Sequence, residues 1–294
     1  MFRKEREISG HAGAIYSCTF DGTYIYSGSA DKFVARWIPE EGIQDKFAIK
    51  FEHSIYALEH YESFLLVGRS DGGFHVFNTD SRTEEKYFTQ HTKAIFTIQI
   101  NPVKGHCYVA DADGNVSVWD VNEWELLLYL PLDCGKIREI AVAQDGSRIA
   151  ICGQDGNIRI FDTDTFNEIF TINAHKNGAT AASFDGASND LLISGGKDAM
   201  LRLWDLPSGA CLKEIPAHNF AIYKIMQVGE AIVSVSRDKT VKIFSKDFQF
   251  IKRLDHKEGG HKHSVNDAVP LDDYRFVTCG DDSRMIIWTS KVID

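Results

Sequence analysis

Aspartates and histidines, residue types that often act in catalysis and metal binding, recur through this chain at regular positions. In seven places an aspartate is followed six residues later by a large aromatic residue, beginning with Asp31 and Trp37. The loop HKEGGHKH also brings His256, His261 and His263 close in sequence, and three such ligands could bind a metal. Acid–base pairs, metal ligands and purely structural groups are therefore the interpretations to weigh.

The spacing of the aspartates indicates that the chain is built from repeats. Successive aspartates lie 40, 42, 42, 43, 40 and 44 residues apart. Because each aspartate belongs to a separate repeat, we expect these carboxylates to be structural rather than paired for catalysis. The seven pairs are Asp31 and Trp37, Asp71 and Phe77, Asp113 and Trp119, Asp155 and Phe161, Asp198 and Trp204, Asp238 and Phe244, and Asp282 and Trp288.

Within each repeat, short stretches of alternating apolar and polar residues are separated by turn residues. The first repeat contains four such stretches, AIYSCTF, YIYSGS, FVARWI and KFAIKF. Alternation with a period of two predicts antiparallel strands, and Asp-Gly pairs such as Asp21-Gly22 favour tight hairpin turns. Four strands per repeat, seven times over, predict an all-β, seven-bladed β-propeller with four antiparallel strands per blade.

The two ends of the chain are expected to close the ring. The last repeat supplies only three strands, whereas residues 3–8 form a strand that precedes the first repeat. This N-terminal strand is therefore expected to complete the last blade and to remove an exposed sheet edge. We expect a single propeller domain over residues 1–294, with blades over residues 10–51, 52–90, 91–131, 132–172, 173–215, 216–254 and 255–294.

The repeats resemble those of WD-repeat β-propeller proteins over essentially the whole chain. Gly10-His11 begins the first repeat as in that family, and Trp119-Asp120 and Trp204-Asp205 are typical repeat ends. The resemblance implies that the aspartate holds a histidine, which bonds a serine or threonine that accepts the indole N–H. Complete sets occur in three repeats: His11, Ser27, Asp31 and Trp37; His175, Ser194, Asp198 and Trp204; His261, Thr278, Asp282 and Trp288.

The other four repeats lack part of this set. In the second and fourth repeats an aliphatic residue replaces the hydroxyl and a phenylalanine replaces the indole, so no donor loses its acceptor. The third repeat combines Val109 with Trp119 and the sixth combines Ser234 with Phe244, and the sequence explains neither combination. Because His261 already belongs to a complete set, a metal site in its loop is not expected.

The resemblance also implies that partners dock on one face of the ring, around the central channel. The residue after the first apolar residue of each repeat's first strand is expected to open onto this face. These residues are Tyr16, Tyr56, Phe96, Arg138, Thr180, Tyr223 and Asn266, to which Lys197 and Arg237 add positive charge just before two turn aspartates.

Aromatic and arginine side chains are favoured at protein interfaces. The anchors expected to contact a partner protein or peptide are Tyr16, Tyr56, Phe96 and Tyr223. Arg138, Lys197 and Arg237 are expected to contact its acidic groups. The alternatives are that the aromatic rings only pack together, or that the propeller is an enzyme, such as a hydrolase or isomerase, acting at the channel mouth.

Composition and charge narrow the class of partner. The 32 basic and 42 acidic residues give a net charge of −10, which repels phosphate backbones, so nucleic acid is not expected. No apolar run is long enough for a membrane helix. The six cysteines have no disulfide-like or metal-binding spacing, as in a reduced cytoplasmic protein. We expect a monomeric, cytoplasmic, non-catalytic scaffold without cofactor or metal, whose partner the sequence does not identify.

Overall fold

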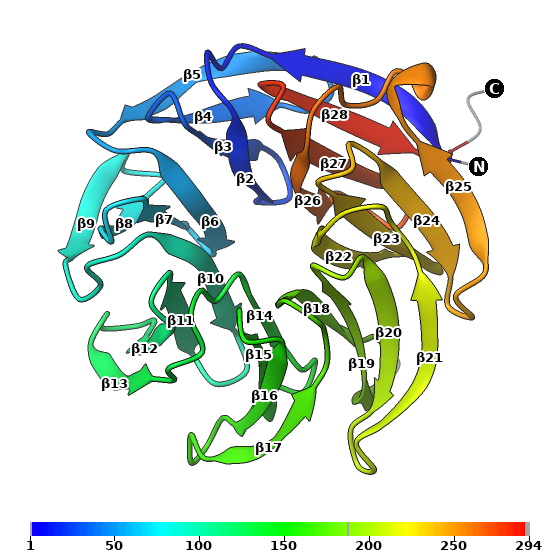
Figure 1. Cartoon of the computed structure of the whole chain (residues 1–294). Helices are drawn as coiled ribbons and strands as arrows, with labels where there is room; N and C mark the ends of the chain where they lie inside the picture. Colours follow the sequence, from blue (N-terminus) through cyan, green and yellow to red (C-terminus); the bar gives the residue numbers. More distant parts are fainter. Residues whose placement is uncertain (1, 187, 292–294) are drawn as a thin grey trace.

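Seven antiparallel sheets of four strands form a ring in the computed structural model, which describes residues 2–186 and 188–291 (Figure 1). We number these sheets as blades 1 to 7 in chain order. Strands within a blade pair with their neighbours in sequence, except that the first strand of the chain belongs to blade 7. The prediction of a seven-bladed all-β propeller is confirmed.

The first four blades follow one another along the chain. Blade 1 contains β2 (Ile15–Phe20), β3 (Ile25–Ser29), β4 (Phe33–Ile38) and β5 (Ile43–Lys50). Blade 2 contains β6 (Ile55–Tyr61), β7 (Phe64–Arg69), β8 (Phe74–Asn78) and β9 (Thr83–Phe88). Blade 3 contains β10 (Ile95–Asn101), β11 (His106–Asp111), β12 (Asn115–Asp120) and β13 (Leu126–Pro131). Blade 4 contains β14 (Glu139–Val142), β15 (Arg148–Cys152), β16 (Asn157–Asp162) and β17 (Glu168–Asn173).

The last three blades complete the ring. Blade 5 contains β18 (Ala179–Asp185), β19 (Ser188–Gly196), β20 (Met200–Asp205) and β21 (Ala210–Pro216). Blade 6 contains β22 (Ile222–Val228), β23 (Ala231–Ser236), β24 (Val241–Ser245) and β25 (Phe250–Leu254). After the short 3₁₀ helix η1 (His256–Glu258), blade 7 contains β26 (Val265–Pro270), β27 (Arg275–Gly280), β28 (Arg284–Thr289) and β1 (Arg3–Ser9). In the described part of the chain, no helix is long and apolar enough to cross a membrane.

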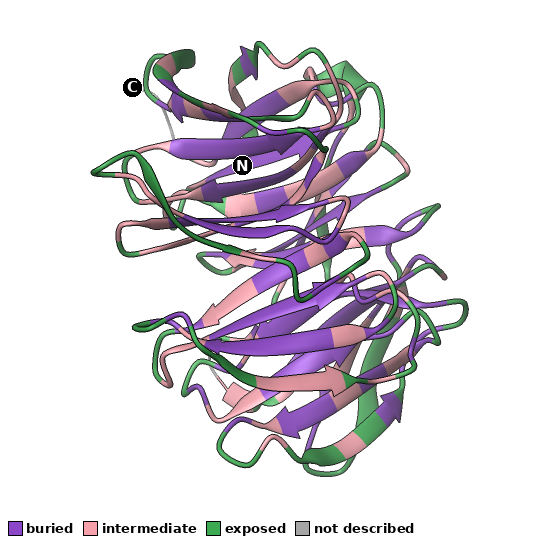
Figure 2. Cartoon of the chain, turned by 90° about the vertical axis from the view of Figure 1, so that its left-hand side faces the viewer, coloured by how far each residue is buried: buried purple, intermediate pink, exposed green. Residues whose placement is uncertain are grey.

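The hydrophobic core lies between neighbouring blades. The first strand of each blade is innermost, as Figure 1 shows, and contacts the first strands of the blades on either side. Glycines on second strands permit the closest approach: a Cβ on Gly28 or Gly68 would lie 2.5 Å from Ile55 or Ile95 of the next blade. Buried residues fill the inner strands, whereas exposed residues lie in the loops and on outermost strands such as β9 and β21 (Figure 2).

The N-terminal strand closes the ring, as predicted. β1 pairs antiparallel with β28 and becomes the outermost strand of blade 7. Ile8 is 1% exposed and packs with residues of blades 7 and 1, while the Phe2 ring lies 5.3 Å from that of Phe276. The chain ends are therefore joined by both hydrogen bonds and apolar contacts.

Buried polar networks tie each turn to its blade in blades 1, 5 and 7. In blade 1, Nδ1 of His11 lies 2.8 Å from the Asp31 carboxylate, and Nε2 lies 2.7 Å from the Ser27 hydroxyl. The indole N–H of Trp37 donates to the same hydroxyl at 2.7 Å. The structure contains the equivalent bonds among His175, Ser194, Asp198 and Trp204 and among His261, Thr278, Asp282 and Trp288.

Blade 3 has a complete network of a different composition, so the expected roles of Asp113 and Val109 are wrong. The carboxylate that holds His91 is that of Asp111, at 2.8 Å, whereas Asp113 is exposed. Ser117 supplies the hydroxyl, 2.8 Å from both Nε2 of His91 and the indole nitrogen of Trp119. The hydroxyl thus comes from β12, the strand that carries the indole, rather than from β11.

The remaining blades keep only part of this network. In blade 6 the Ser234 hydroxyl lies 2.8 Å from Nε2 of His218, and Nδ1 of that ring lies 3.0 Å from Asp238. Arginines bind the turn aspartates of the other two: Arg69 pairs with Asp71 in blade 2, where Nε2 of His53 also lies 3.6 Å from that carboxylate, and Arg159 pairs with Asp155 in blade 4.

The carboxylates in these networks remain ionised. Burial alone would raise the pKa of Asp198, Asp238 and Asp282. The hydrogen bonds and charges of the histidines, together with further donors beside each carboxylate, outweigh it, so each pKa lies well below its usual value. Burial also lowers the pKa of His175 and His218, which favours their neutral form. A neutral imidazole can donate to the carboxylate and accept from the hydroxyl, which satisfies the whole network.

The revised network of blade 3 can be tested by substitution. Ser117→Ala is expected to lower the free energy of unfolding by about 1–3 kcal/mol, because it leaves the His91 and Trp119 nitrogens buried without a partner. Asp113→Ala, at an exposed residue, serves as the control and is expected to change it by less than about 0.5 kcal/mol. Urea denaturation measures both, and an equal loss from the two variants would contradict the assignment.

Closure by β1 predicts a large cost for truncating its buried side chain. Ile8→Ala is expected to lower the free energy of unfolding by about 2–5 kcal/mol, because it leaves a cavity between blades 7 and 1. Ser9→Ala, at an exposed neighbour on the same strand, is expected to have little effect. Thermal and urea denaturation compare the two, and a wild-type-like Ile8→Ala protein would show that β1 contributes little to the ring.

Candidate docking site at the mouth of the channel

A repeated irregularity in strand pairing positions the side chains at the channel mouth. In six blades, the pairing of the first strand with the second skips one residue near the start of the first strand. Such a β-bulge redirects the side chain of the extra residue. The skipped residues are Tyr16, Tyr56, Phe96, Thr180, Tyr223 and Asn266. In blade 4, β14 begins just after the corresponding residue, Arg138.

All of these residues except Thr180 line a cavity of about 610 Å³ in the centre of the ring. Its wall is formed mainly by first strands and contains both the redirected residues and residues deeper in the channel. Of the residues predicted to bind a partner, those that line the cavity are Tyr16, Tyr56, Phe96, Arg138, Tyr223 and Arg237. Lys197 is exposed and is not part of this wall.

Aromatic rings from blades 1, 2 and 3 form a continuous row at the mouth. The rings of Tyr16 and Tyr56 meet edge to face with centroids 4.8 Å apart, and those of Tyr56 and Phe96 stack with centroids 5.2 Å apart. All three side chains are half-buried. The row therefore offers apolar surface that is already held in place by ring–ring contacts.

Arg138 continues the row into blades 4 and 6. Its guanidinium carbon lies 5.3 Å from the ring centroid of Phe96 and 4.5 Å from that of Tyr223. The ammonium of Lys136 also lies 4.3 Å from the Phe96 centroid. Together Tyr16, Tyr56, Phe96, Arg138 and Tyr223 are called the aromatic–arginine row below.

Blade 5 contributes no side chain to this row. Thr180 is buried, and its hydroxyl donates to the backbone carbonyl of Ile222 at 2.5 Å. The short threonine leaves room for Arg138 of blade 4 to reach Tyr223 of blade 6. On the opposite side of the mouth, the amide of Asn266 donates to the backbone carbonyl of Ile15 and to the carboxylate of Asp281.

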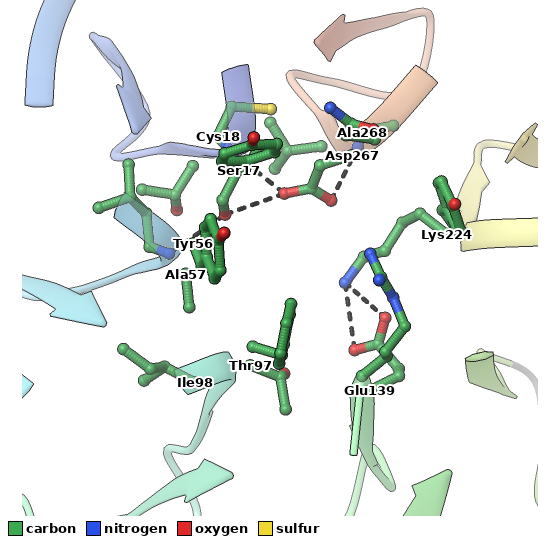
Figure 3. Close-up of a pocket in the computed structure, with 18 of the residues that line it drawn as sticks. Ser17, Cys18, Tyr56, Ala57, Thr97, Ile98, Glu139, Lys224, Asp267 and Ala268 are labelled. Atoms are coloured by element: carbon green, nitrogen blue, oxygen red, sulfur yellow. Dashed lines mark hydrogen bonds and ion pairs between the residues drawn. The ribbon is translucent and has the colours of Figure 1, made fainter. Parts of the chain in front are cut away.

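The deeper wall of the cavity carries buried charges that the sequence prediction missed (Figure 3). The Lys224 ammonium lies 2.9 and 3.2 Å from the two carboxylate oxygens of Glu139. Across the channel, the Asp267 carboxylate accepts hydrogen bonds from the Ser17 hydroxyl at 3.0 Å and from the Cys18 backbone N–H at 3.1 Å. These charges are therefore largely satisfied by neighbouring groups.

Lys224 reaches Glu139 across blade 5, which lies between their blades. The corresponding residue in blade 5 is Ala181, which is small and buried. Burial alone would lower the pKa of Lys224, but the carboxylates of Glu139, Asp267 and Glu59 outweigh it and raise the pKa. The ammonium therefore stays charged within the cavity.

Glu59 is the carboxylate in this wall with the least support. It accepts a hydrogen bond from the Gln99 amide at 3.3 Å and one from the adjacent His60 backbone N–H at 2.9 Å. Burial raises its pKa to about 7, and the charges of Asp267 and Glu139 add to that effect while Lys224 opposes it. Glu59 therefore changes its charge near neutral pH.

The missed residues do carry a sequence signal. They lie one or three positions after the skipped residue on the same first strand, where side chains also face the channel. Taken one position further along, the seven first strands contribute Ser17, Ala57, Thr97, Glu139, Ala181, Lys224 and Asp267. Three of these seven residues are charged and four are small, which indicates that charged side chains interact with one another inside the channel.

The described residues contain no group of three or more histidine, cysteine, aspartate or glutamate side chains that could hold a metal ion. His261 of the HKEGGHKH loop bonds Asp282 and Thr278 instead. All six cysteines are free, and five of them are buried. The arrangement at the mouth is thus suited to contact and recognition through aromatic, guanidinium and ammonium groups.

Comparison with protein families gives a match to the model described as "WD domain, G-beta repeat". The matched residues are 2–37, 82–120, 129–162, 166–205, 209–245 and 251–289. Residues 38–81 lie between two matched stretches and include β5, β6, β7 and β8. In blade 2 Arg69 contacts Asp71 more closely than His53 does.

Curated relatives match the chain at low identity. The U3 small nucleolar RNA-associated protein 21 of Saccharomyces cerevisiae is 27% identical over 165 residues, which are 56% of this chain and 17% of that protein. The U5 small nuclear ribonucleoprotein 40 kDa protein of Dictyostelium discoideum is 26% identical over 74% of this chain and 50% of its own length. Telomerase protein component 1 of Mus musculus is 25% identical over 78% and 9%. The chain thus spans half or less of each relative.

The raised pKa of Glu59 predicts that ionisation of this side chain destabilises the folded protein as the pH rises. Because its pKa is raised in the folded protein, the stability it contributes is complete below about pH 4.5 and is lost as the pH rises through 7. Glu59→Gln is expected to stabilise the protein by about 1–2 kcal/mol more at pH 8 than at pH 5.5. Urea denaturation at both pH values measures this difference.

The exposed Glu52→Gln is the matched control for the loss of one negative charge. It is expected to change the free energy of unfolding equally at the two pH values. A pH-independent effect of Glu59→Gln would show that the pKa of Glu59 is not raised in the folded protein.

Proposed function

Because the chain belongs to the WD-repeat β-propeller family, we propose that it is a non-catalytic scaffold that binds a partner protein or peptide at the channel mouth. The observation that carries this proposal is the aromatic–arginine row, which lines the mouth of a cavity of about 610 Å³. Its residue types are those that supply most of the binding energy at protein interfaces.

The geometry of the row supports binding rather than packing alone. The row is held by ring–ring and cation–π contacts, so little side-chain entropy remains to be lost when a partner binds. Its members are half-buried, unlike the fully buried aromatic residues between blades such as Trp37 and Trp288. The exposed Phe220, which precedes β22, adds apolar surface outside the cavity.

The names of the relatives support membership of an assembly. One is described as RNA-associated, one as a ribonucleoprotein protein and one as a telomerase component. We propose that this chain likewise acts by binding other proteins. Its monomeric state, its cytoplasmic location and the absence of nucleic acid binding stay predictions.

The alternative of a propeller enzyme gains less support. A catalytic site would need reactive groups in the cavity, and carboxylates are present there. However, Glu139 is bound by Lys224, and Asp267 accepts hydrogen bonds from Ser17 and Cys18. Among the carboxylates of the deeper wall, this leaves Glu59 with a pKa suited to proton transfer. The described residues hold no metal-binding group, and burial raises the pKa of the nearby Cys107 thiol, which disfavours its nucleophilic form.

The proposed docking site predicts loss of partner binding when the row is truncated. Tyr56→Ala combined with Phe96→Ala is expected to reduce the recovery of specifically bound proteins at least tenfold, because both apolar anchors are removed. The measurement is affinity purification from the native cell lysate with quantitative mass spectrometry. Circular dichroism verifies that the variant is folded.

Tyr274→Ala is the control. Tyr274 is an exposed tyrosine in the loop between β26 and β27, away from the cavity wall. It is expected to leave the recovered proteins unchanged. If the double variant recovers the same proteins in the same amounts as the wild type, the proposed site is wrong.

A further inference from the structure

Arg138 differs from the other partly buried arginines because its donors are free. In the described part of the chain, its guanidinium makes cation–π contacts with Phe96 and Tyr223 but no hydrogen bond or ion pair. Most other such arginines are paired with carboxylates: Arg36 with Asp45, Arg69 with Asp71, Arg159 with Asp155, Arg202 with Asp198, Arg275 with Glu40 and Arg284 with Asp282. Arg6 instead donates to the backbone carbonyl of Glu41.

The geometry of Arg138 leaves one kind of interaction available. Two aromatic rings hold the guanidinium, and it lies in the wall of the open cavity. Its N–H groups lie in the guanidinium plane, in a fork that matches the two oxygens of a carboxylate. A guanidinium fixed in this way loses little freedom on binding such a group.

Further cations without a counter-ion lie near Arg138. In the described chain, Lys136, Lys197 and Arg237 form no ion pair, and Lys136 and Arg237 line the cavity with Arg138. The pKa of Lys136 is lowered by burial and by the positive charges of Arg138 and Lys197. Like charges gathered without partners, in a protein of net charge −10, indicate an anionic ligand.

The deeper wall limits how much negative charge the ligand can carry. Glu59, Glu139 and Asp267 line the cavity below the mouth and contribute three carboxyl groups, against the ammonium of Lys224. At the rim, Asp281 adds another carboxylate on the side of Asn266. A phosphate dianion would be repelled by these groups about twice as strongly as a singly charged carboxylate at the same position.

We propose that the mouth binds an acidic segment of a partner protein and that Arg138 binds an aspartate or glutamate carboxylate of that segment. The inference rests on the proposed function and assigns the chemistry of the partner. The Phe96, Tyr56 and Tyr16 rings contact apolar parts of the same segment, while Lys136 and Arg237 surround its negative charge. Arg138 thereby determines specificity for acidic over neutral segments.

A selected peptide provides the probe. Peptides of twelve residues are selected from a random library on the immobilised wild-type protein, and the strongest binder is synthesised with a fluorescent label. An analogue replaces each aspartate and glutamate with asparagine and glutamine, and another replaces the critical acidic residue with phosphoserine. Fluorescence anisotropy gives the Kd of each peptide for the wild type, Arg138→Met, Arg138→Lys, and Tyr56→Ala combined with Phe96→Ala.

The expected result is a selected peptide rich in aspartate or glutamate whose amide analogue binds the wild type at least tenfold more weakly. Arg138→Met keeps an unbranched apolar stem and removes the charged fork, so it is expected to weaken the acidic peptide at least tenfold and the analogue less than twofold. Arg138→Lys is expected to be intermediate. Arg82→Met removes an exposed arginine and is the control for net charge, with no change expected.

Other results overturn the inference. Equal binding of the acidic peptide and its amide analogue, or an unchanged preference in Arg138→Met and Arg138→Lys, would remove Arg138 from recognition. Tighter binding of the phosphoserine peptide by more than tenfold would replace carboxylate with phosphate as the ligand. If binding still depends on Tyr56 and Phe96 in these cases, the proposed docking site stands. Loss of that dependence, or failure to select any peptide, contradicts both proposals.

Discussion

The skipped residue near the start of the first strand in six of the seven blades is the constraint on which the channel mouth depends. A regular strand would send alternate side chains to the channel and to the next blade. The bulge places one extra side chain at the rim while the residue before it stays between blades and the residue after it faces the channel. Tyr16 thus lies at the mouth between the buried Ile15 and the channel-facing Ser17.

The same geometry separates charge along the channel. Arg138 occupies the corresponding position just before β14 and Glu139 begins that strand, so blade 4 places a cation at the mouth and an anion below it. Lys224 neutralises Glu139 from two blades away, since blade 5 has small side chains at both levels. The cations at the mouth therefore remain available to bind a ligand, whereas the ammonium of Lys224 inside the channel is paired with Glu139.

The repeats allowed the fold to be predicted from the sequence, because turn residues and alternation recur seven times and each copy supports the others. The network of blade 3 could not be predicted, because the fixed spacing selects Asp113 and Val109. In the structure Asp111 and Ser117 supply the carboxylate and the hydroxyl instead, because their side chains lie within hydrogen-bond distance of the two ring nitrogens of His91. A hydrogen-bond network requires positions in space, and several sequence spacings meet that requirement.

The candidate site was predictable only in part for a related reason. One position per repeat identified the aromatic–arginine row, but the internal charges occupy the following positions and interact across the channel. Lys197 was expected beside Arg237 from its place in the repeat, yet its side chain is exposed outside the cavity wall. The contact of Arg138 with Tyr223 depends on the short Thr180 between them, and no pattern within one repeat reveals that.

The position of the Arg138 guanidinium against the Phe96 and Tyr223 rings is tested most directly by the side-chain ¹H–¹⁵N spectrum of the arginine Nε groups. The account predicts an Arg138 Nε–H signal, identified by its absence in Arg138→Lys, that is shifted upfield by the Phe96 and Tyr223 rings and returns downfield in Tyr223→Leu. A signal at the position of the exposed Arg82 would contradict it.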